Sequence, residues 1–132
     1  MSEEAKKYET TAEHFSYFKA QCQVFIKFFG LYDWKVVFEH KSGKDGSLAA
    51  CRPYVTDKMA VIYLSPDWDE WEPTNADLRQ VAFHEVCEML LSDIHGAAHD
   101  TEFTPRQREN EMGYHVHALI RRMENCVLPL IK

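Results

Sequence analysis

The chain has 132 residues, of which 45% are hydrophobic and 13% aromatic, and its formal net charge is −6. A chain of this length and apolar content folds as a single globular domain and is not intrinsically disordered. The acidic balance argues against a nucleic-acid partner, because such binding draws most of its affinity from clustered Lys and Arg. We therefore expect one domain over residues 1–132.

The cellular location is predicted from what the sequence lacks. The longest apolar stretches, such as residues 24–31 with Lys27 inside, are too short to span a bilayer. The N-terminus has neither the apolar core nor the cleavage site of a signal peptide. We predict a cytoplasmic protein with no membrane partner. Four widely spaced cysteines form no C-x-x-C pair: Cys22, Cys51, Cys87 and Cys126.

The first half of the chain begins with a helical pattern. Apolar residues recur at spacings of three and four over residues 10–29, which predicts an N-terminal helix with one buried face that ends at Gly30. Residues 34–39 are β-branched and aromatic and predict a strand, and residues 41–47 supply turn chemistry. The apolar stripe of the helix comprises Phe15, Phe18, Cys22, Phe25, Ile26 and Phe29.

Two further strands are predicted over residues 48–55 and 59–64. The three residues between them are few enough for an antiparallel hairpin, and Pro53 pushes the first strand toward an edge or a bulge. Residues 65–73 are acidic and rich in Trp, which indicates a loop. These patterns predict a three-stranded, mostly antiparallel sheet.

The second half of the chain is predicted to be helical. Thr74 or Asn75 can cap a helix that carries the motif described below, and the polar stretch from Gly96 to Phe103 breaks the pattern. Thr104-Pro105 with Gln107 predicts a capping box for a C-terminal helix. The order of helix, three strands and two helices predicts a small α+β fold. The predicted buried face of the last helix comprises Met112, Val116, Leu119, Ile120, Met123 and Val127.

The motif His84-Glu85-Val86-Cys87-Glu88 falls on the second of these helices. Residues four apart sit one turn above each other, so His84 and Glu88 can bind one metal ion from one face. This spacing is typical of the H-E-x-x-H zinc hydrolases, in which the Glu that follows the first His polarises a metal-bound water. Here the second ligand position is a Glu, not a His.

The sequence resembles the small phage-type zinc metallopeptidases, which are relatives of the SprT-like and other minimal zincins. The resemblance extends over most of the chain and is carried by residues 30–34 before the first strand, residues 78–94 around the motif, and residues 119–125. It implies a minimal zincin-like fold, Zn²⁺ as the cofactor, and hydrolysis of a peptide or protein substrate.

The resemblance also suggests the metal ligands. It implies a His where Glu88 stands and a Glu on the last helix near His117, so the two changes would compensate each other. His84, Glu88 and His117 would still form a set of two His and one carboxylate, which suits catalytic zinc. His115 is the alternative third ligand. Weaker candidates are Glu109, Glu111, His95, His99, Asp100 and Glu102.

In the resulting mechanism zinc lowers the pKa of its water to about 7 and Glu85 acts as the general base. Simpler interpretations stay open: Glu85 as a solvated helix residue, Glu88 as an ion-pair partner of a nearby Arg or Lys such as Arg121, and His117 as a surface residue. A second function, from another class, is a zincin fold without catalysis that binds a protein. If the source is a phage, the chain would act on a host protein in the host cytoplasm.

Overall fold

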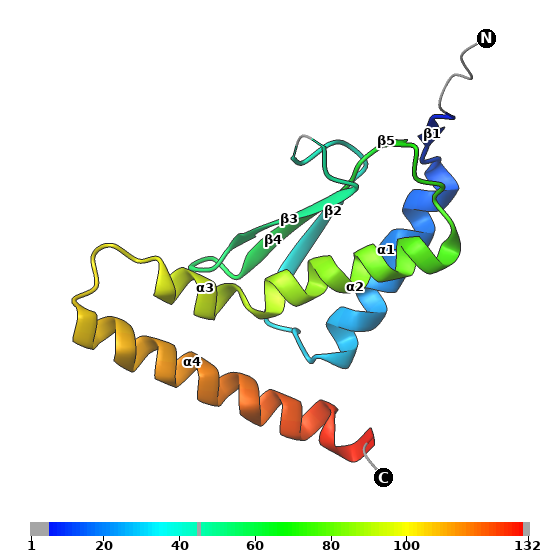
Figure 1. Ribbon diagram of the computed structural model, residues 1–132. Coiled ribbons are helices and arrows are strands. Elements are labelled where there is room, and N and C mark those ends of the chain that lie inside the picture. The colour runs from blue at the N-terminus through cyan, green and yellow to red at the C-terminus, as the bar shows by residue number, and fades with distance from the viewer. Residues whose placement is uncertain (1–5, 45, 131–132) are drawn as a thin grey trace.

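The computed structural model describes residues 6–44 and 46–130, which form an α+β fold (Figure 1). Within these residues, no helix is both long and apolar enough to cross a membrane. The elements in chain order are β1 (Tyr8–Glu9), α1 (Ala12–Phe28), β2 (Lys35–Glu39), β3 (Ala49–Tyr54), β4 (Met59–Leu64), β5 (Asp67–Asp69), α2 (Asn75–Leu90), α3 (Ser92–Ala98), α4 (Pro105–Cys126) and a short 3₁₀ turn, η1 (Leu128–Leu130).

Helix boundaries follow from local capping chemistry. The Thr11 hydroxyl accepts a hydrogen bond from the His14 N–H, and the His14 ring accepts one from the Thr11 N–H, which together start α1. Gly30, with φ of +66°, ends the same helix. Thr104 and Gln107 form the capping box that starts α4. The predicted N-terminal, motif-bearing and C-terminal helices are therefore confirmed.

The main sheet has the strand order β2-β4-β3. The antiparallel β3–β4 hairpin is confirmed, and β3, with Pro53, lies at an edge. However, β2 runs parallel to β4, so the sheet is mixed and the prediction of a mostly antiparallel sheet is wrong. The physical reason is that β4 is the most buried strand and takes the central position, which leaves β2 beside a strand of its own direction.

Two segments differ from their predictions. Within the predicted loop 65–73, β5 pairs with β1 in a two-stranded antiparallel sheet. The buried side chain of Trp68, which donates a hydrogen bond to the Leu48 carbonyl at 3.1 Å, anchors this acidic segment. The predicted break from Gly96 to Phe103 begins later than expected, because α3 runs through Gly96 to Ala98, and residues 99–104 then separate it from α4.

The core lies between the sheet and the helices α1 and α2, which cover one face of the sheet (Figure 1). The two helices pack closely: the Cys22 thiol lies against the Ala82 carbonyl, and the Phe25 and Phe83 rings meet edge to face at 5.2 Å. The largest fully buried side chains are Trp68, Phe18, Ile62, Leu64, Leu78, Met89, Val86 and Cys22.

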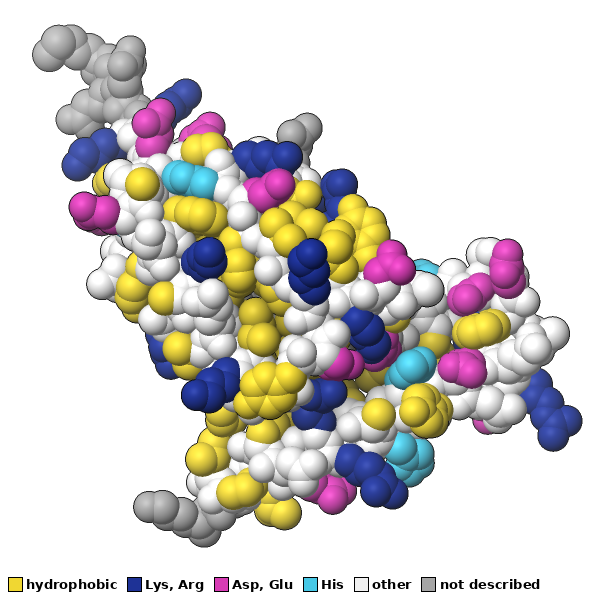
Figure 2. Space-filling view, turned by 180° about the vertical axis from the view of Figure 1, so that it is seen from behind, with side chains coloured by type: hydrophobic (Ala, Val, Ile, Leu, Met, Phe, Trp, Pro, Cys, Tyr) yellow, Lys and Arg dark blue, Asp and Glu magenta, His cyan; other side chains and the backbone are white. Residues whose placement is uncertain are grey.

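The apolar stripe of α4 is less buried than the sequence predicts. Among the described residues of α4 none is fully buried, and Val116, Ile120 and Met123 are 40%, 47% and 40% exposed. The reason is that α4 packs against α3 and not across the sheet, so only one edge of its stripe is partly covered. Hydrophobic side chains also reach the surface near the C-terminal end of the chain (Figure 2).

The loop between β2 and β3 provides a test of the fold. A Cβ atom added at Gly43 would lie 2.4 Å from Cδ2 and 2.5 Å from Cγ of the Tyr63 ring. We expect Gly43→Ala to lower the free energy of unfolding by about 1–3 kcal/mol, measured by urea denaturation. As a control, Gly113→Ala on α4 meets no atom within 4 Å and should raise it by about 0.5–1 kcal/mol. Wild-type stability of Gly43→Ala would contradict this loop position.

Candidate metal centre

The histidine and the two glutamates of the motif lie close together on α2. The Thr74 hydroxyl caps the first turn of this helix. One ligand atom from each of His84, Glu85 and Glu88 lies within 4.8 Å of the others. The distance between His84 Nε2 and Glu88 Oε1 is 3.3 Å, as expected for residues four apart on a helix. We call these three residues the metal group, because imidazole and carboxylate oxygens are common ligands of divalent ions.

Members of the metal group differ in exposure. The side chains of His84 and Glu88 are 68% and 51% exposed, whereas Glu85 is only 5% exposed. Its Oε2 atom is buried and has no hydrogen-bond partner among the described residues. A buried acceptor without a partner costs about 1–3 kcal/mol, and more when it is charged. The interpretation of Glu85 as a solvated helix residue is therefore wrong, and its carboxyl group requires a proton or a cation.

The electrostatics of the metal group favour the binding of positive charge. Burial, and then the nearby Glu88 carboxylate, raise the pKa of Glu85 to about 8. On β3, burial followed by the charges of Glu85 and Glu88 raises the pKa of the Cys51 thiol to about 12. A cation bound at this place would relieve the repulsion between the two carboxylates.

A cavity of about 490 Å³ borders Glu88 and lies between the edge strand β3 and α3. Its walls are mainly apolar, because the β3 side chains that face α2 are small or aliphatic and Leu91 lies opposite them. The metal group therefore opens onto a groove that could hold part of a substrate. The other lining residues are Cys51, Pro53, Val55, Ser92, His95 and Gly96.

Neither histidine predicted as the third ligand belongs to the metal group. His115 lies 3.6 Å from Glu111 and lines a small cavity together with Leu90. Leu90 follows Glu88 by two residues and is therefore about 200° around α2 from it. Figure 1 likewise shows α4 on the side of α2 away from the sheet. Ligation by His117, which is exposed, stays a prediction and would require α4 to move.

The weaker candidates also lie outside the metal group. The rings of His95 and His99 stack on each other at α3, with centroids 4.4 Å apart, and His95 borders the same cavity as Glu88. Glu88 contacts His84, and no ion pair with Arg121 is found among residues 6–44 and 46–130. The candidates without a place in the metal group are Glu109, Glu111, Asp100 and Glu102.

No protein-family model, curated protein or solved structure matches this chain. Functional inference therefore rests on the metal group and its surroundings. Sequence reasoning missed one neighbour of this group, Cys51, whose proximity depends on the packing of β3 against α2. No spacing in the sequence could have indicated it, because Cys51 and His84 are more than thirty residues apart.

Burial of Glu85 predicts an unusual pH dependence of stability. Since the pKa of Glu85 is near 8 when folded and about 4.3 when unfolded, its stabilising contribution is complete below about pH 4 and is lost as the pH rises to about 8. Glu85→Gln cannot ionise. Between about pH 5 and 8, the chelator-treated wild type should lose roughly 2–4 kcal/mol of unfolding free energy relative to this variant, measured by urea denaturation.

The exposed Glu102 provides the control, because Glu102→Gln should follow the wild-type profile at both pH values. If wild type and Glu85→Gln gave parallel profiles, the carboxyl group of Glu85 would be solvated.

Proposed function

We propose that this chain is a metal-dependent peptidase in which His84 and Glu88 bind a divalent ion and Glu85 is the general base. The observation that carries this proposal is the buried Glu85 carboxyl group, with an unpartnered oxygen, beside two exposed ligand side chains on one helix face. The imidazole of His84 and the carboxylate of Glu88 are donor groups of the kind that bind Zn²⁺, and Glu85 lies beside them. A bound divalent ion would polarise the substrate carbonyl and lower the pKa of a water molecule.

Glu85 has the properties that a general base requires. A base works best when its pKa lies near the working pH, and burial brings the pKa of this carboxyl group to about 8. A positive charge beside it would favour the ionised form, which accepts a proton. Glu85 would take a proton from water and return it to the leaving amine. Its burial fixes the carboxyl group and keeps bulk solvent away from it.

A peptide is the substrate that the surroundings of the metal group support best. β3 is an edge strand, so its free main-chain groups can pair with an extended peptide. The cavity beside Glu88 has the volume and the apolar walls to take a substrate side chain. This groove and the metal group adjoin each other at Glu88, which would bring a bound peptide close to Glu85.

The second candidate function is a protein-binding module without catalysis. One observation favours it: the metal group offers only two exposed ligand side chains, and α4 places His115 and His117 outside it. In this case the groove along β3 would bind a protein segment, and removal of the metal would leave the binding of that segment intact.

The metal content of single variants tests which side chains bind the ion. After dialysis against zinc, the wild type should retain close to one ion per chain, and His84→Ala and Glu88→Ala should each lower the affinity about 10–100-fold or more. Elemental analysis and calorimetric titration measure these quantities. The structure leads us to expect that His117→Ala, the matched control on α4, retains the metal. Loss of zinc from folded His117→Ala would show that α4 moves and that this histidine is the third ligand.

Hydrolysis tests catalysis separately from binding. With the zinc-loaded protein and an unfolded, carboxymethylated protein as the substrate, we expect Glu85→Gln to lower the cleavage rate by about 10²–10⁴-fold while retaining zinc. Cleavage is followed by mass spectrometry of the products. A wild type that binds zinc at His84 and Glu88 yet cleaves nothing, while still binding the unfolded substrate, would favour the protein-binding module.

A further inference from the structure

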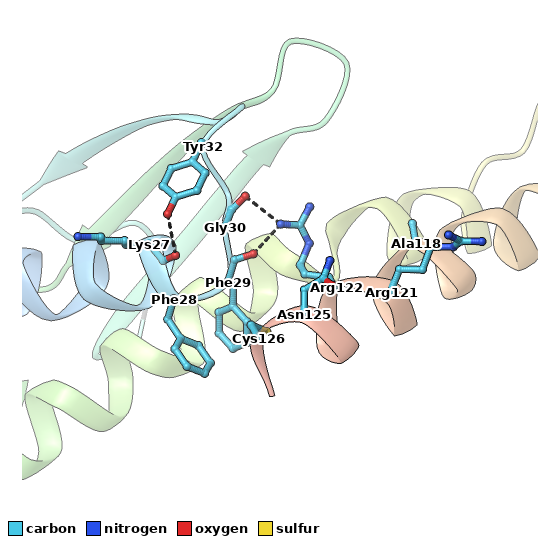
Figure 3. Close-up of a pocket in the computed structure, with 10 residues that line it drawn as sticks. All are labelled: Lys27, Phe28, Phe29, Gly30, Tyr32, Ala118, Arg121, Arg122, Asn125 and Cys126. Carbon is cyan, nitrogen blue, oxygen red and sulfur yellow. Dashed lines mark hydrogen bonds between the residues drawn. The ribbon is translucent and has the colours of Figure 1, made fainter. Parts of the chain in front are cut away.

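A second cavity lies between the end of α1 and the last turns of α4 (Figure 3). It is open to solvent, has a volume of about 450 Å³, and is bordered by the cationic side chains of Lys27, Arg121 and Arg122. Among the described residues, no Asp or Glu lines it. This local charge is opposite to that of the whole chain, whose net charge is −6. We call this place the basic cavity.

Arg122 is held in a fixed position at the centre of the basic cavity. Its Nη1 donates hydrogen bonds to the carbonyls of Phe29, at 2.5 Å, and Gly30, at 3.0 Å. These bonds satisfy the end of α1, where the helix dipole is negative. The guanidinium group has three further N–H donors on Nε and Nη2, and these have no partner among the described residues. A pre-oriented arginine with free donors suits a carboxylate.

Unlike Arg122, the side chains of Lys27 and Arg121 form no hydrogen bond to the backbone among the described residues. Figure 3 shows them on either side of Arg122, one on α1 and the other on α4. Both are exposed, and within residues 6–44 and 46–130 neither forms an ion pair. The three cations together therefore form a row that a stretch of alternating acidic side chains could match.

The rest of the basic cavity suits a peptide. The Tyr32 ring is 75% exposed but is held in place, because its hydroxyl donates a hydrogen bond to the Lys27 carbonyl at 3.3 Å. Phe28 adds a second exposed aromatic surface, and the Asn125 amide can both donate to and accept from a peptide backbone. Fixed aromatic rings beside cations are typical of protein-binding surfaces.

We propose that the basic cavity is a docking site for an acidic segment of a partner protein, whose Asp or Glu side chains pair with Arg122, Lys27 and Arg121. A nucleic-acid strand fits less well, because it would extend beyond three cations onto a surface of net negative charge. The site shares no residue with the metal group, so this inference does not depend on the proposed peptidase function.

The test uses fluorescence anisotropy at low salt with a short rhodamine-labelled peptide in which glutamate alternates with serine. We expect the full-length protein to bind it and added salt to weaken binding. Arg121→Glu and Lys27→Glu should each weaken binding about ten-fold, because an attraction becomes a repulsion. Arg121→Gln should weaken it about three-fold. Circular dichroism verifies the fold of each variant, and Arg122 is left intact because it caps α1.

Arg106→Glu is the matched control, since it makes the same charge change at an exposed arginine of α4 that does not line the cavity. It should change binding less than about two-fold. The proposal is overturned if the glutamate peptide does not bind, if Arg106→Glu weakens binding as much as Arg121→Glu, or if a lysine–serine peptide binds equally well. Tighter binding of oligothymidylate that also depends on Arg121 would overturn it in favour of a nucleic-acid site.

Discussion

The packing of one face of α2 against α1 and the sheet is the constraint on which the rest of the structure depends. Leu78, Ala82 and Val86 are fully buried in this contact. Because Glu85 follows Ala82 by three residues, its carboxyl group is carried to the edge of the same buried face. The helix therefore places an acid in a position that is largely shielded from bulk solvent, while His84 and Glu88 on the next face remain exposed.

Such an arrangement has an energetic cost that the fold must tolerate. An ionised, unpartnered carboxylate is unfavourable in the interior, and Glu88 adds a like charge nearby. A bound cation would offset both effects, so metal binding and stability are linked through one residue. Sites that combine burial, like charges and an adjoining cavity are where functional acids and bases tend to occur. The burial of Glu85 beside Glu88 and a cavity therefore supports a functional role for this residue, even without a relative of known activity.

The position of α4 separates two surfaces on opposite sides of α2. The metal group and its apolar groove lie toward β3, whereas the basic cavity lies where α4 crosses the end of α1. Arg122 connects α4 to the carbonyls of Phe29 and Gly30 and so helps fix this crossing. A segment bound in the basic cavity could therefore be held without blocking the groove beside Glu88.

The sequence by itself determined the helices α1, α2 and α4, the strands β2, β3 and β4, and the motif, because these depend on near neighbours. Thr11, Thr104 and Gly30 act within one turn of chain, and His84 and Glu88 meet through helical spacing alone. Only the tertiary structure decided the parallel pairing of β2 with β4, the burial of Glu85 and the placement of His117 outside the metal group. Each of these depends on which elements pack together across long stretches of chain, and no local pattern encodes that choice.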